Sequence, residues 1–248
     1  MCRQAASSWS AAEYLSITHS ASTFTERNER MLREILGRRR RERTALMSAV
    51  LTCARWRWPV VPGVGYDRWS GVCRCGATDC RVPGAHPGEP PLLAATCDER
   101  MARWWWQQTP DASVILATGG RVAALSVPSE AGARSLDQLA RLGVRTGPVV
   151  AAPGRYAFLV EPYELGELGE LLDRYGLDRY GTVPSTLRFH GDGGYLALPP
   201  SRVQGGLLRW ARPPAPSGDP TAGGPWLPAV ADLVRTLVDT CQHAGPRA

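Results

Sequence analysis

The segment GRVAALSVPSEAG, residues 120–132, holds the strand around which the rest of the fold is expected to assemble. Its run of small and apolar residues predicts a buried β-strand, and the Pro, Ser and Gly residues after it predict a loop. The end of a buried strand is where α/β enzymes often carry catalytic carboxylates. Here the strand delivers Ser126 and Pro128 instead. The sequence therefore raises the question of whether this strand ends in an active site or in a degenerate one.

Other segments predict strands and helices in alternation. Residues 113–120 (SVILATGG) and 121–127 (RVAALSV) predict two strands joined by a Gly-Gly turn. Residues 147–162 predict a hairpin that turns at its Pro-Gly pair, and residues 185–201 predict two strands around a Gly-rich turn. Amphipathic helices are expected over residues 129–143, 163–177 and 226–244. Strands interleaved with helices predict an α+β domain, a mixed sheet with packed helices.

The chain is expected to divide into four segments. Residues 1–43 are predicted to be a disordered or basic helical N-terminal extension. Residues 44–212 are expected to form the folded domain, with Thr44 as the N-cap of its first helix. A Pro/Gly-rich linker over residues 213–225 and a C-terminal helix within residues 226–248 complete the prediction.

Positive charge is concentrated in one segment. The formal net charge is +6, and all 29 basic residues are Arg. Residues 26–57 hold ten Arg against four Glu, so this segment alone accounts for the net charge. Arg38, Arg39, Arg40 and Arg41 are therefore the candidate contacts to nucleic acid. The alternative is a solvated helix face without a polyanionic partner.

Membrane insertion and secretion are not expected. The sequence has no apolar run long enough to span a bilayer and no convincing secretory signal. We therefore expect a cytoplasmic protein with no membrane partner. Seven Cys, an odd number, in a reducing compartment do not predict a disulfide framework.

Three of these Cys lie close together and need a separate explanation. Cys73, Cys75, Cys80 and His86 follow the spacing C-x-C-x4-C-x5-H. Three thiolates and an imidazole can close a tetrahedron around zinc and leave no position for water, which predicts a structural zinc knuckle at residues 73–86. Cys97 is the alternative fourth ligand if His86 faces away. Free Cys in a reducing cytosol are the alternative to a metal site.

Three consecutive tryptophans, Trp104, Trp105 and Trp106, fall in a helix that is expected to begin at a capping box of Thr96 and Glu99. Aromatic faces can stack on unpaired bases. Consecutive helical residues point in different directions, however, so part of the group is expected in the core. Core packing is the preferred interpretation, and base stacking is the alternative.

Taken in order, several segments resemble one known family. Residues 45–63 (ALMSAVLTCARWRWPVVPG) are similar to the opening helix and strand of the N-terminal domain of bifunctional DNA primase/polymerases. The Cys-rich loop, the Trp-rich helix and residues 113–120 follow in the family's order. Residues 191–201 (GDGGYLALPPS) are the most specific piece. The resemblance covers residues 44–212 and is to short actinobacterial members of this Prim-Pol family, within the archaeo-eukaryotic primase superfamily.

The resemblance implies a split, RRM-like core that binds nucleotides and nucleic acid. Active members carry two carboxylates at the end of the strand corresponding to VAALSV, a His after a Gly-rich turn, and a third carboxylate before the GDGGY block. These carboxylates hold the two divalent ions of nucleotidyl transfer. This chain has Ser126 and Pro128 in place of the acidic pair, Tyr156 in place of the His, and Arg188 in place of the third acid. The resemblance therefore implies a degenerate catalytic centre without enzyme activity.

Cationic residues remain in the expected cleft. Arg155, Arg188 and His190 are the candidate contacts to a nucleotide or phosphate, which Arg can bind without a metal. In the other interpretation, Arg188 pairs with an acid such as Asp192. The expected function is nucleotide or nucleic-acid binding in a replication-related or regulatory role.

Two alternative functions stay open. One is an active nucleotidyltransferase, dependent on Mg²⁺ or Mn²⁺, that uses other acids. Glu130, Asp137 and Asp192 are the nearest ones in the sequence, and two or more would have to converge. The other alternative is a protein-interaction module whose cleft is idle.

Overall fold

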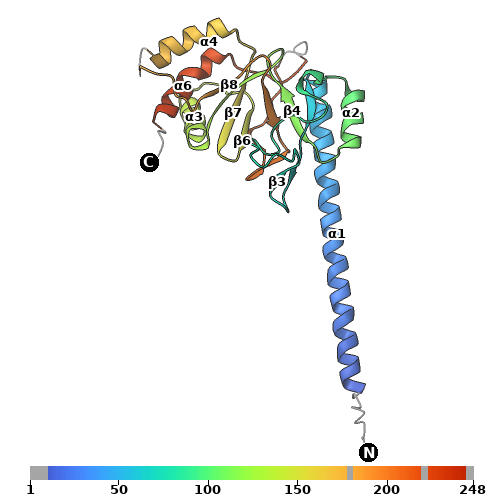
Figure 1. Ribbon diagram of the computed structural model, residues 1–248. Helices are drawn as coiled ribbons and strands as arrows, with labels where there is room; N and C mark the ends of the chain where they lie inside the picture. Colours follow the sequence, from blue (N-terminus) through green and yellow to red (C-terminus); the bar gives the residue numbers. More distant parts are fainter. Residues whose placement is uncertain (1–10, 178–180, 219–222, 244–248) are drawn as a thin grey trace, which may run out of the picture. The chain divides into compact units, whose positions relative to one another are not determined.

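The computed structural model describes residues 11–177, 181–218 and 223–243 of the chain (Figure 1). Helix α1 runs without a break from Ala11 to Arg55. Two units divide between Thr44 and Ala45, inside this helix. Thr44 is therefore not the N-cap predicted for it, and its hydroxyl donates to the carbonyl of Arg40 one turn earlier. Residues 1–10 of the expected extension lie outside the described residues.

The second unit contains a three-stranded antiparallel sheet. The sheet contains β1 (Val60–Gly63), β4 (Ser113–Ala117) and β9 (Tyr195–Leu198), in the order β1-β4-β9. The last turns of α1 and helix α2 (Glu99–Gln108) contribute buried side chains to the same core, which forms because these helices and strands each carry a continuous apolar face. The largest fully buried side chains of this core include Trp58, Trp106, Ile115 and Leu116.

A five-stranded antiparallel sheet forms the other half of the core. Its order is β12-β6-β7-β5-β8. The strands are β5 (Ala123–Pro128), β6 (Val149–Ala152), β7 (Arg155–Val160), β8 (Arg188–His190) and β12 (Arg209–Arg212). The hairpin predicted over residues 147–162 is confirmed as β6 and β7. The central strand β5 is buried almost throughout, as its apolar run predicts.

Helices cover one face of this sheet. They are α3 (Ser129–Arg141), α4 (Leu165–Leu172) followed by the π-turn Asp173–Leu177, and α6 (Val230–Gln242) (Figure 1). Alternate residues of β5 and β7 pack against these helices in a second apolar cluster. The opposite residues of the same strands, including Ser126 and Arg155, therefore face away from the helices.

The segments SVILATGG and RVAALSV form two strands on either side of the predicted Gly-Gly turn, but the two strands do not pair with each other. They are β4 and β5, and each belongs to a different sheet. Strands β8 and β9, on either side of the Gly-rich turn, are divided between the sheets in the same way. The loop between β4 and β5 contacts the loop between β8 and β9. The amide of Thr118 donates to the carbonyl of Gly194 (3.0 Å), and the Thr118 hydroxyl donates to the carbonyl of Gly191 (2.8 Å). This junction holds the two sheets together at one end.

The α+β class with packed helices is confirmed. The predicted mixed sheet is wrong, because the described strands pair antiparallel throughout, in these two sheets and in two small hairpins. The hairpins are β2 (Tyr66–Asp67) with β3 (Val72–Cys73), and β10 (Arg202–Val203) with β11 (Gly206–Leu207). A 3-10 turn at Leu92–Ala94 precedes α2.

Helix α2 begins at a side-chain N-cap. Its N-cap is Asp98, whose Oδ1 accepts from the amides of Arg100 and Met101, so the predicted capping box of Thr96 and Glu99 is wrong. A carboxylate one residue before the helix satisfies two free amides and interacts favourably with the helix dipole. Within the helix, Trp106 is buried and Trp104 is 56% exposed.

In the described part of the chain, no helix combines the length and the apolar character that crossing a membrane requires.

Candidate ligand pocket and metal centre

A pocket of about 540 Å³ lies between the two sheets, on the face of β5 and β7 opposite the helices. This volume is within the range that suits a small-molecule ligand. Its lining comes from β5, β6, β7 and β8 on one side, from β9 on the other, and from the β10–β11 hairpin and residues 81–85 at the edge. The two sheets are joined at Thr118, and the pocket lies in the space between them.

The pocket is mainly apolar, and its charged residues are all basic. Apolar side chains such as Val150, Ala157 and Leu208 form its walls. Arg155, Arg188 and His190 project into it from β7 and β8, and Arg81 lies at its edge. The described lining contains no Asp or Glu. The pocket therefore has a positive potential that favours an anionic group attached to an apolar body.

Arg155 is held by a set of hydrogen bonds to oxygen atoms. Its Nη2 donates to the carbonyl oxygens of Ser126 (2.6 Å) and Thr186 (2.8 Å) and to Oγ of Ser126 (3.2 Å). Its Nε donates to the same Oγ at 3.3 Å. Burial, together with the nearby charge of Arg188, lowers the pKa of Arg155, which nevertheless remains a cation. The guanidinium is thus fixed in position while its charge stays uncompensated by any carboxylate.

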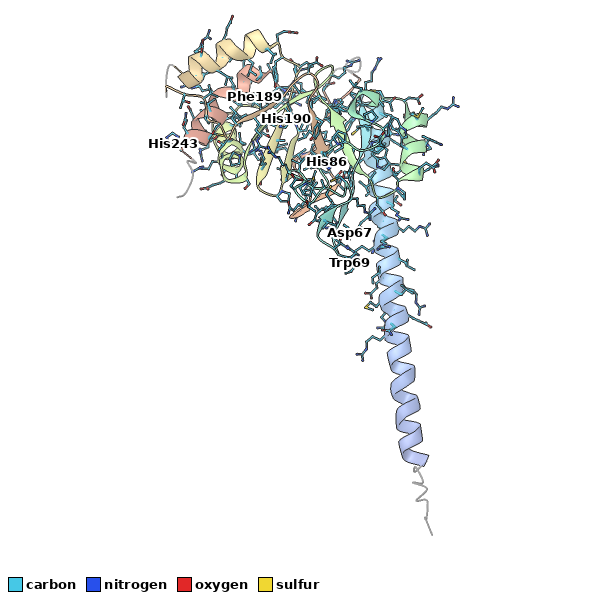
Figure 2. The ribbon with its side chains drawn as sticks, viewed as in Figure 1. Asp67, Trp69, His86, Phe189, His190 and His243 are labelled. Carbon is cyan, nitrogen blue, oxygen red and sulfur yellow. The ribbon has the colours of Figure 1, made fainter. Side chains whose placement is uncertain are left out.

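Ser126 connects Arg155 to His190. The Nδ1 atom of His190 lies 3.1 Å from the carbonyl oxygen of Tyr195, so this nitrogen carries the proton and donates. The other ring nitrogen, Nε2, therefore accepts from the Ser126 hydroxyl at 2.9 Å. His190 is labelled in Figure 2. Burial lowers the pKa of His190, and the charges of Arg155 and Arg188 lower it further. At neutral pH, His190 is a neutral acceptor beside two cations.

Arg188 lies on the same face of β8 as His190 and pairs in register with Ser126. Across the described residues, no carboxylate forms an ion pair with Arg188 or Arg155. The pairing of Arg188 with Asp192 considered above is therefore not made. Two neighbouring cations without a counter-ion disfavour each other, and an anion between them relieves that repulsion.

Two predicted positions lie away from this group. Pro128 ends β5 at the start of α3, opposite Arg155 in the ladder, and does not line the pocket. Tyr156 is on the opposite face of β7, where it packs beside Gly132 of α3 with the second apolar cluster. The alternation of side chains along a strand separates Tyr156 from its neighbour Arg155.

The acids considered as replacement ligands do not converge on the pocket. Glu130 is exposed on α3, and its Oε1 lies 3.8 Å from Nη1 of Arg134. Asp137 lines a separate surface depression between α3 and α6, and Asp192 lies in the turn against Gly119. Among the described residues, the Cys73–His86 cluster is the one group of three or more Cys, His, Asp or Glu side chains close enough to share a metal ion.

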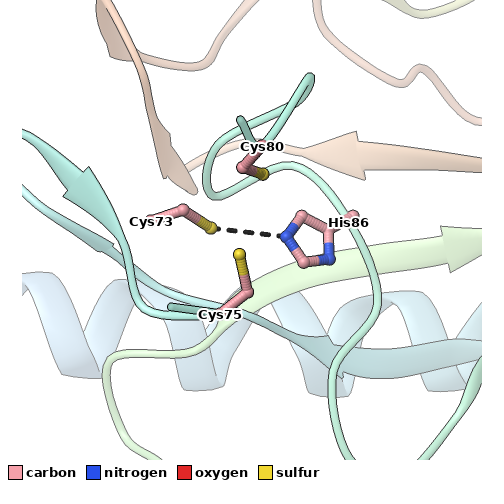
Figure 3. A group of neighbouring side chains, drawn as sticks. All are labelled: Cys73, Cys75, Cys80 and His86. Atoms are coloured by element: carbon pink, nitrogen blue, oxygen red, sulfur yellow. Dashed lines mark hydrogen bonds between the residues drawn. The ribbon is translucent and has the colours of Figure 1, made fainter. Parts of the chain in front are cut away.

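The metal cluster has the four members predicted from the spacing. The ligand atoms of Cys73, Cys75, Cys80 and His86 all lie within 4.8 Å of one another (Figure 3). The Sγ atom of Cys73 is 3.3 Å from Nε2 of His86. Three sulfurs and one imidazole nitrogen are the donor set that suits a closed tetrahedral metal site. These residues can therefore hold a metal such as zinc.

Hydrogen bonds around the cluster favour the metal-binding forms of His86 and Cys73. His86 donates from Nδ1 to the carbonyl oxygen of Pro87 (2.9 Å), which leaves Nε2 free to bind a metal. Burial alone would raise the pKa of Cys73, but the amides of Cys75 and Gly84 and the neighbouring thiols bring it below its usual value. The thiolate that ligates a metal is thus favoured at Cys73. Cys97 is not in the cluster, because His86 faces the three thiols.

Arg38, Arg39, Arg40 and Arg41 lie on α1, in the first unit, and all four are exposed to solvent. Their side chains are free to meet a polyanion. They are not part of the pocket.

The fold and the pocket define an α+β domain with a cleft, lined by basic residues, between two antiparallel sheets. Comparison with protein families identifies the family. A model described as "Bifunctional DNA primase/polymerase, N-terminal" matches residues 50–225, most of the chain. The protein belongs to this Prim-Pol family. Neither a curated protein nor a solved structure matches the chain.

Two features of the site are not evident from the sequence. The Ser126–His190 contact joins residues that are 64 positions apart. Residues 81–83, Ala85 and Gln204 form part of the pocket wall, although they belong to the knuckle and to a short hairpin. Arg81 lies between two predicted metal ligands, but so does Arg74, which does not line the pocket, so the sequence alone carries no signal for this wall.

Proposed function

We propose that the protein is a Prim-Pol domain that binds a nucleotide through its phosphate groups, without a catalytic metal pair, in a replication-related or regulatory role. The observation that carries this proposal is the pair Arg155 and Arg188, which lie at one pocket with no carboxylate partner and with His190 beside them. Arg binds phosphate through paired, charge-assisted hydrogen bonds. The apolar walls would receive the base or the sugar.

The same residues argue against nucleotidyl transfer. Two-metal catalysis needs carboxylates that hold two cations a few ångströms apart. The corresponding positions are Ser126, Pro128 and Arg188, and the described lining offers only basic and neutral groups. A divalent ion placed there would meet two guanidinium groups. We therefore propose that the catalytic centre is degenerate and that the guanidinium groups neutralise the phosphates instead.

We propose further that the metal of the Cys73–His86 cluster is zinc and that its role is structural. Zinc binds thiolate and imidazole ligands, and structural zinc sites are almost always tetrahedral. The four protein ligands complete a tetrahedron, so no position is left for a reacting water.

Binding is tested by calorimetry with ATP, on protein loaded with zinc and without added magnesium. Arg188→Ala should weaken binding about tenfold or more, since a charge-assisted hydrogen bond contributes about 1.5–3 kcal/mol. Arg212→Ala is the matched control, because Arg212 is exposed on β12 and does not line the pocket. Equal affinities of both variants and the wild type would refute the proposed pocket.

Catalysis is tested by primer synthesis and extension on a single-stranded template with labelled NTPs and dNTPs, in Mg²⁺ and separately in Mn²⁺. We expect no product from folded, zinc-loaded protein. Template-dependent product that disappears in a Glu130→Ala/Asp192→Ala variant would instead identify a relocated metal site.

A second activity, nucleic-acid binding by Arg38–Arg41, is supported by the exposure of all four side chains on α1. Such binding is electrostatic, so it should weaken steeply with salt. Replacing the four Arg by Ala should remove most of the anisotropy change with labelled single-stranded DNA and leave ATP binding unaltered. Undiminished DNA binding by that variant would contradict this assignment.

A further inference from the structure

The metal cluster and the pocket share one short segment. Residues 81–85 connect the ligands Cys80 and His86, and four of these five residues line the pocket: Arg81, Val82, Pro83 and Ala85. The segment therefore has one side toward the metal ligands and the other toward the ligand cleft. Arg81 is the one charged side chain among the four, and it is exposed at the edge of the cleft.

Gly84 fixes the segment from both sides. Its amide donates to Sγ of Cys73 (3.3 Å), and its carbonyl accepts from the hydroxyl of Ser113 at the start of β4 (2.5 Å). The backbone at Gly84 has φ +78°, and a Cβ there would lie 2.7 Å from Cβ of Tyr66 and 2.9 Å from the carbonyl oxygen of Arg202. Only glycine fits this position, so the loop lies directly against the β10–β11 hairpin.

One hydrogen bond joins the segment to the far edge of the pocket. The amide of Gln204, in the turn between β10 and β11, donates to the carbonyl oxygen of Pro83 at 3.0 Å. Gln204 and Val203 both line the pocket. This hydrogen bond links the position of the hairpin at the pocket edge to that of Pro83.

Apart from Gly84, packing constrains the residues of this segment only weakly. Arg81 and Val82 are exposed, and Pro83 and Ala85 are only partly buried. The fixed points on either side are Cys80 and His86, and a metal that binds both closes the loop between them. Closing a loop through a metal restricts its backbone in a way that a small apolar contact cannot.

We propose that metal binding at the Cys73–His86 cluster builds one wall of the nucleotide pocket, and that Arg81 is its third cationic contact to the phosphates. The assignment of Arg81 rests on the proposed function; the dependence of the wall on the metal does not. Arg81 adds charge at the edge of the cleft, where the outer phosphate of a bound nucleotide meets solvent. Loss of the metal releases Pro83, Gln204 and Arg81 together.

The wall is tested by hydrogen exchange of the amides, in zinc-loaded protein and after removal of zinc by a chelator. The Gln204 amide should be protected with zinc and should exchange at least tenfold faster without it. Amides within β7, which pair with β5 away from the knuckle, serve as the internal control for global unfolding. Unchanged protection of Gln204 in protein shown to have lost its zinc would overturn the proposal.

Arg81 is tested by ATP binding to Arg81→Ala, with zinc content measured on the same sample. We expect affinity to fall about tenfold while zinc content stays at one per chain. The control is Arg74→Ala, which removes an exposed charge from the same knuckle, between two Cys ligands, but not from the pocket lining. Equal affinities of the two variants would refute the role of Arg81.

The two experiments separate the possible failures. If ATP binds to no form of the protein, the proposed function and the role of Arg81 fail together, and the exchange of Gln204 still decides whether the metal builds the wall. If ATP binds and depends on Arg188 but not on zinc or Arg81, the proposed function stands and this inference fails.

Discussion

The Oγ atom of Ser126 on β5 lies 2.9 Å from Nε2 of His190 on β8, with Nε of Arg155 3.3 Å from the same oxygen. The hydroxyl donates to the imidazole and accepts from the guanidinium, so a single small side chain holds two different groups in place. A carboxylate at this position would neutralise Arg155 directly. With Ser, the positive charge of Arg155 remains available to a ligand.

His190 should make stability dependent on pH. Its pKa in the folded protein is depressed from 6.5, chiefly by burial, so the folded state resists a proton that the unfolded state accepts. The contribution of neutral His190 to the free energy of unfolding is therefore fully present above pH 6.5, and it is lost as the pH falls toward the depressed pKa. We expect the melting temperature of the wild type to fall between about pH 7.5 and 5, and to fall less in His190→Gln. Parallel pH profiles for the two proteins would contradict this prediction.

Removing the metal should destabilise the protein. Zinc binding to folded ligands contributes directly to folding, and a loss of a few kcal/mol lowers Tm by roughly 5–10 °C in a chain of this size. Cys75→Ser should lower both zinc content and Tm. Cys97→Ser, a half-buried Cys outside the cluster, should keep both. Calorimetry with metal analysis distinguishes the two, and equal behaviour would contradict a Cys73–His86 site.

The tryptophans of α2 should differ sharply in their contribution to stability. Trp106 is buried, and its Nε1 donates to the carbonyl of Ala112 at 3.1 Å. Trp106→Phe leaves a space and an unpaired carbonyl, at a cost of about 1–3 kcal/mol. Trp104→Phe, at an exposed site on the same helix, should change the free energy of unfolding by less than about 0.5 kcal/mol. Urea denaturation measures both, and similar losses would show that α2 packs differently.

Two glycines in helices should respond oppositely to alanine. A Cβ at Gly132 in α3 would lie 2.5 Å from Cβ of Tyr156, so Gly132→Ala should cost about 1–3 kcal/mol by overpacking α3 against β7. Gly166 in α4 has nothing within 4 Å, so Gly166→Ala should stabilise by about 0.4–1 kcal/mol. A harmless Gly132→Ala, measured by thermal unfolding, would exclude the close approach of Tyr156 to α3.

The sequence predicted well the structures that form within a single short stretch of chain, although it misplaced two helix caps. The β6–β7 hairpin followed from two apolar runs around a Pro-Gly pair, and the metal cluster followed from four ligands within a short loop. The capping box was mistaken because Asp98, two residues after Thr96, is the better-placed oxygen for the first free amides. Thr44 was mistaken as a cap because α1 simply continues through it. Such errors arise where neighbouring residues offer competing local hydrogen bonds.

Local sequence patterns specify which segments are strands and helices, the composition of the metal cluster and the apolar character of β5. Tertiary structure decided that β4 and β5, adjacent in the chain, belong to different sheets. It also decided that Ser126, Arg155, Arg188 and His190 meet at one pocket while Tyr156 faces the helices. Strands that are buried on both faces show little alternation of polar and apolar residues, so their sequence does not specify a partner strand or a face. Only the simultaneous burial of all the strands selects the pairing.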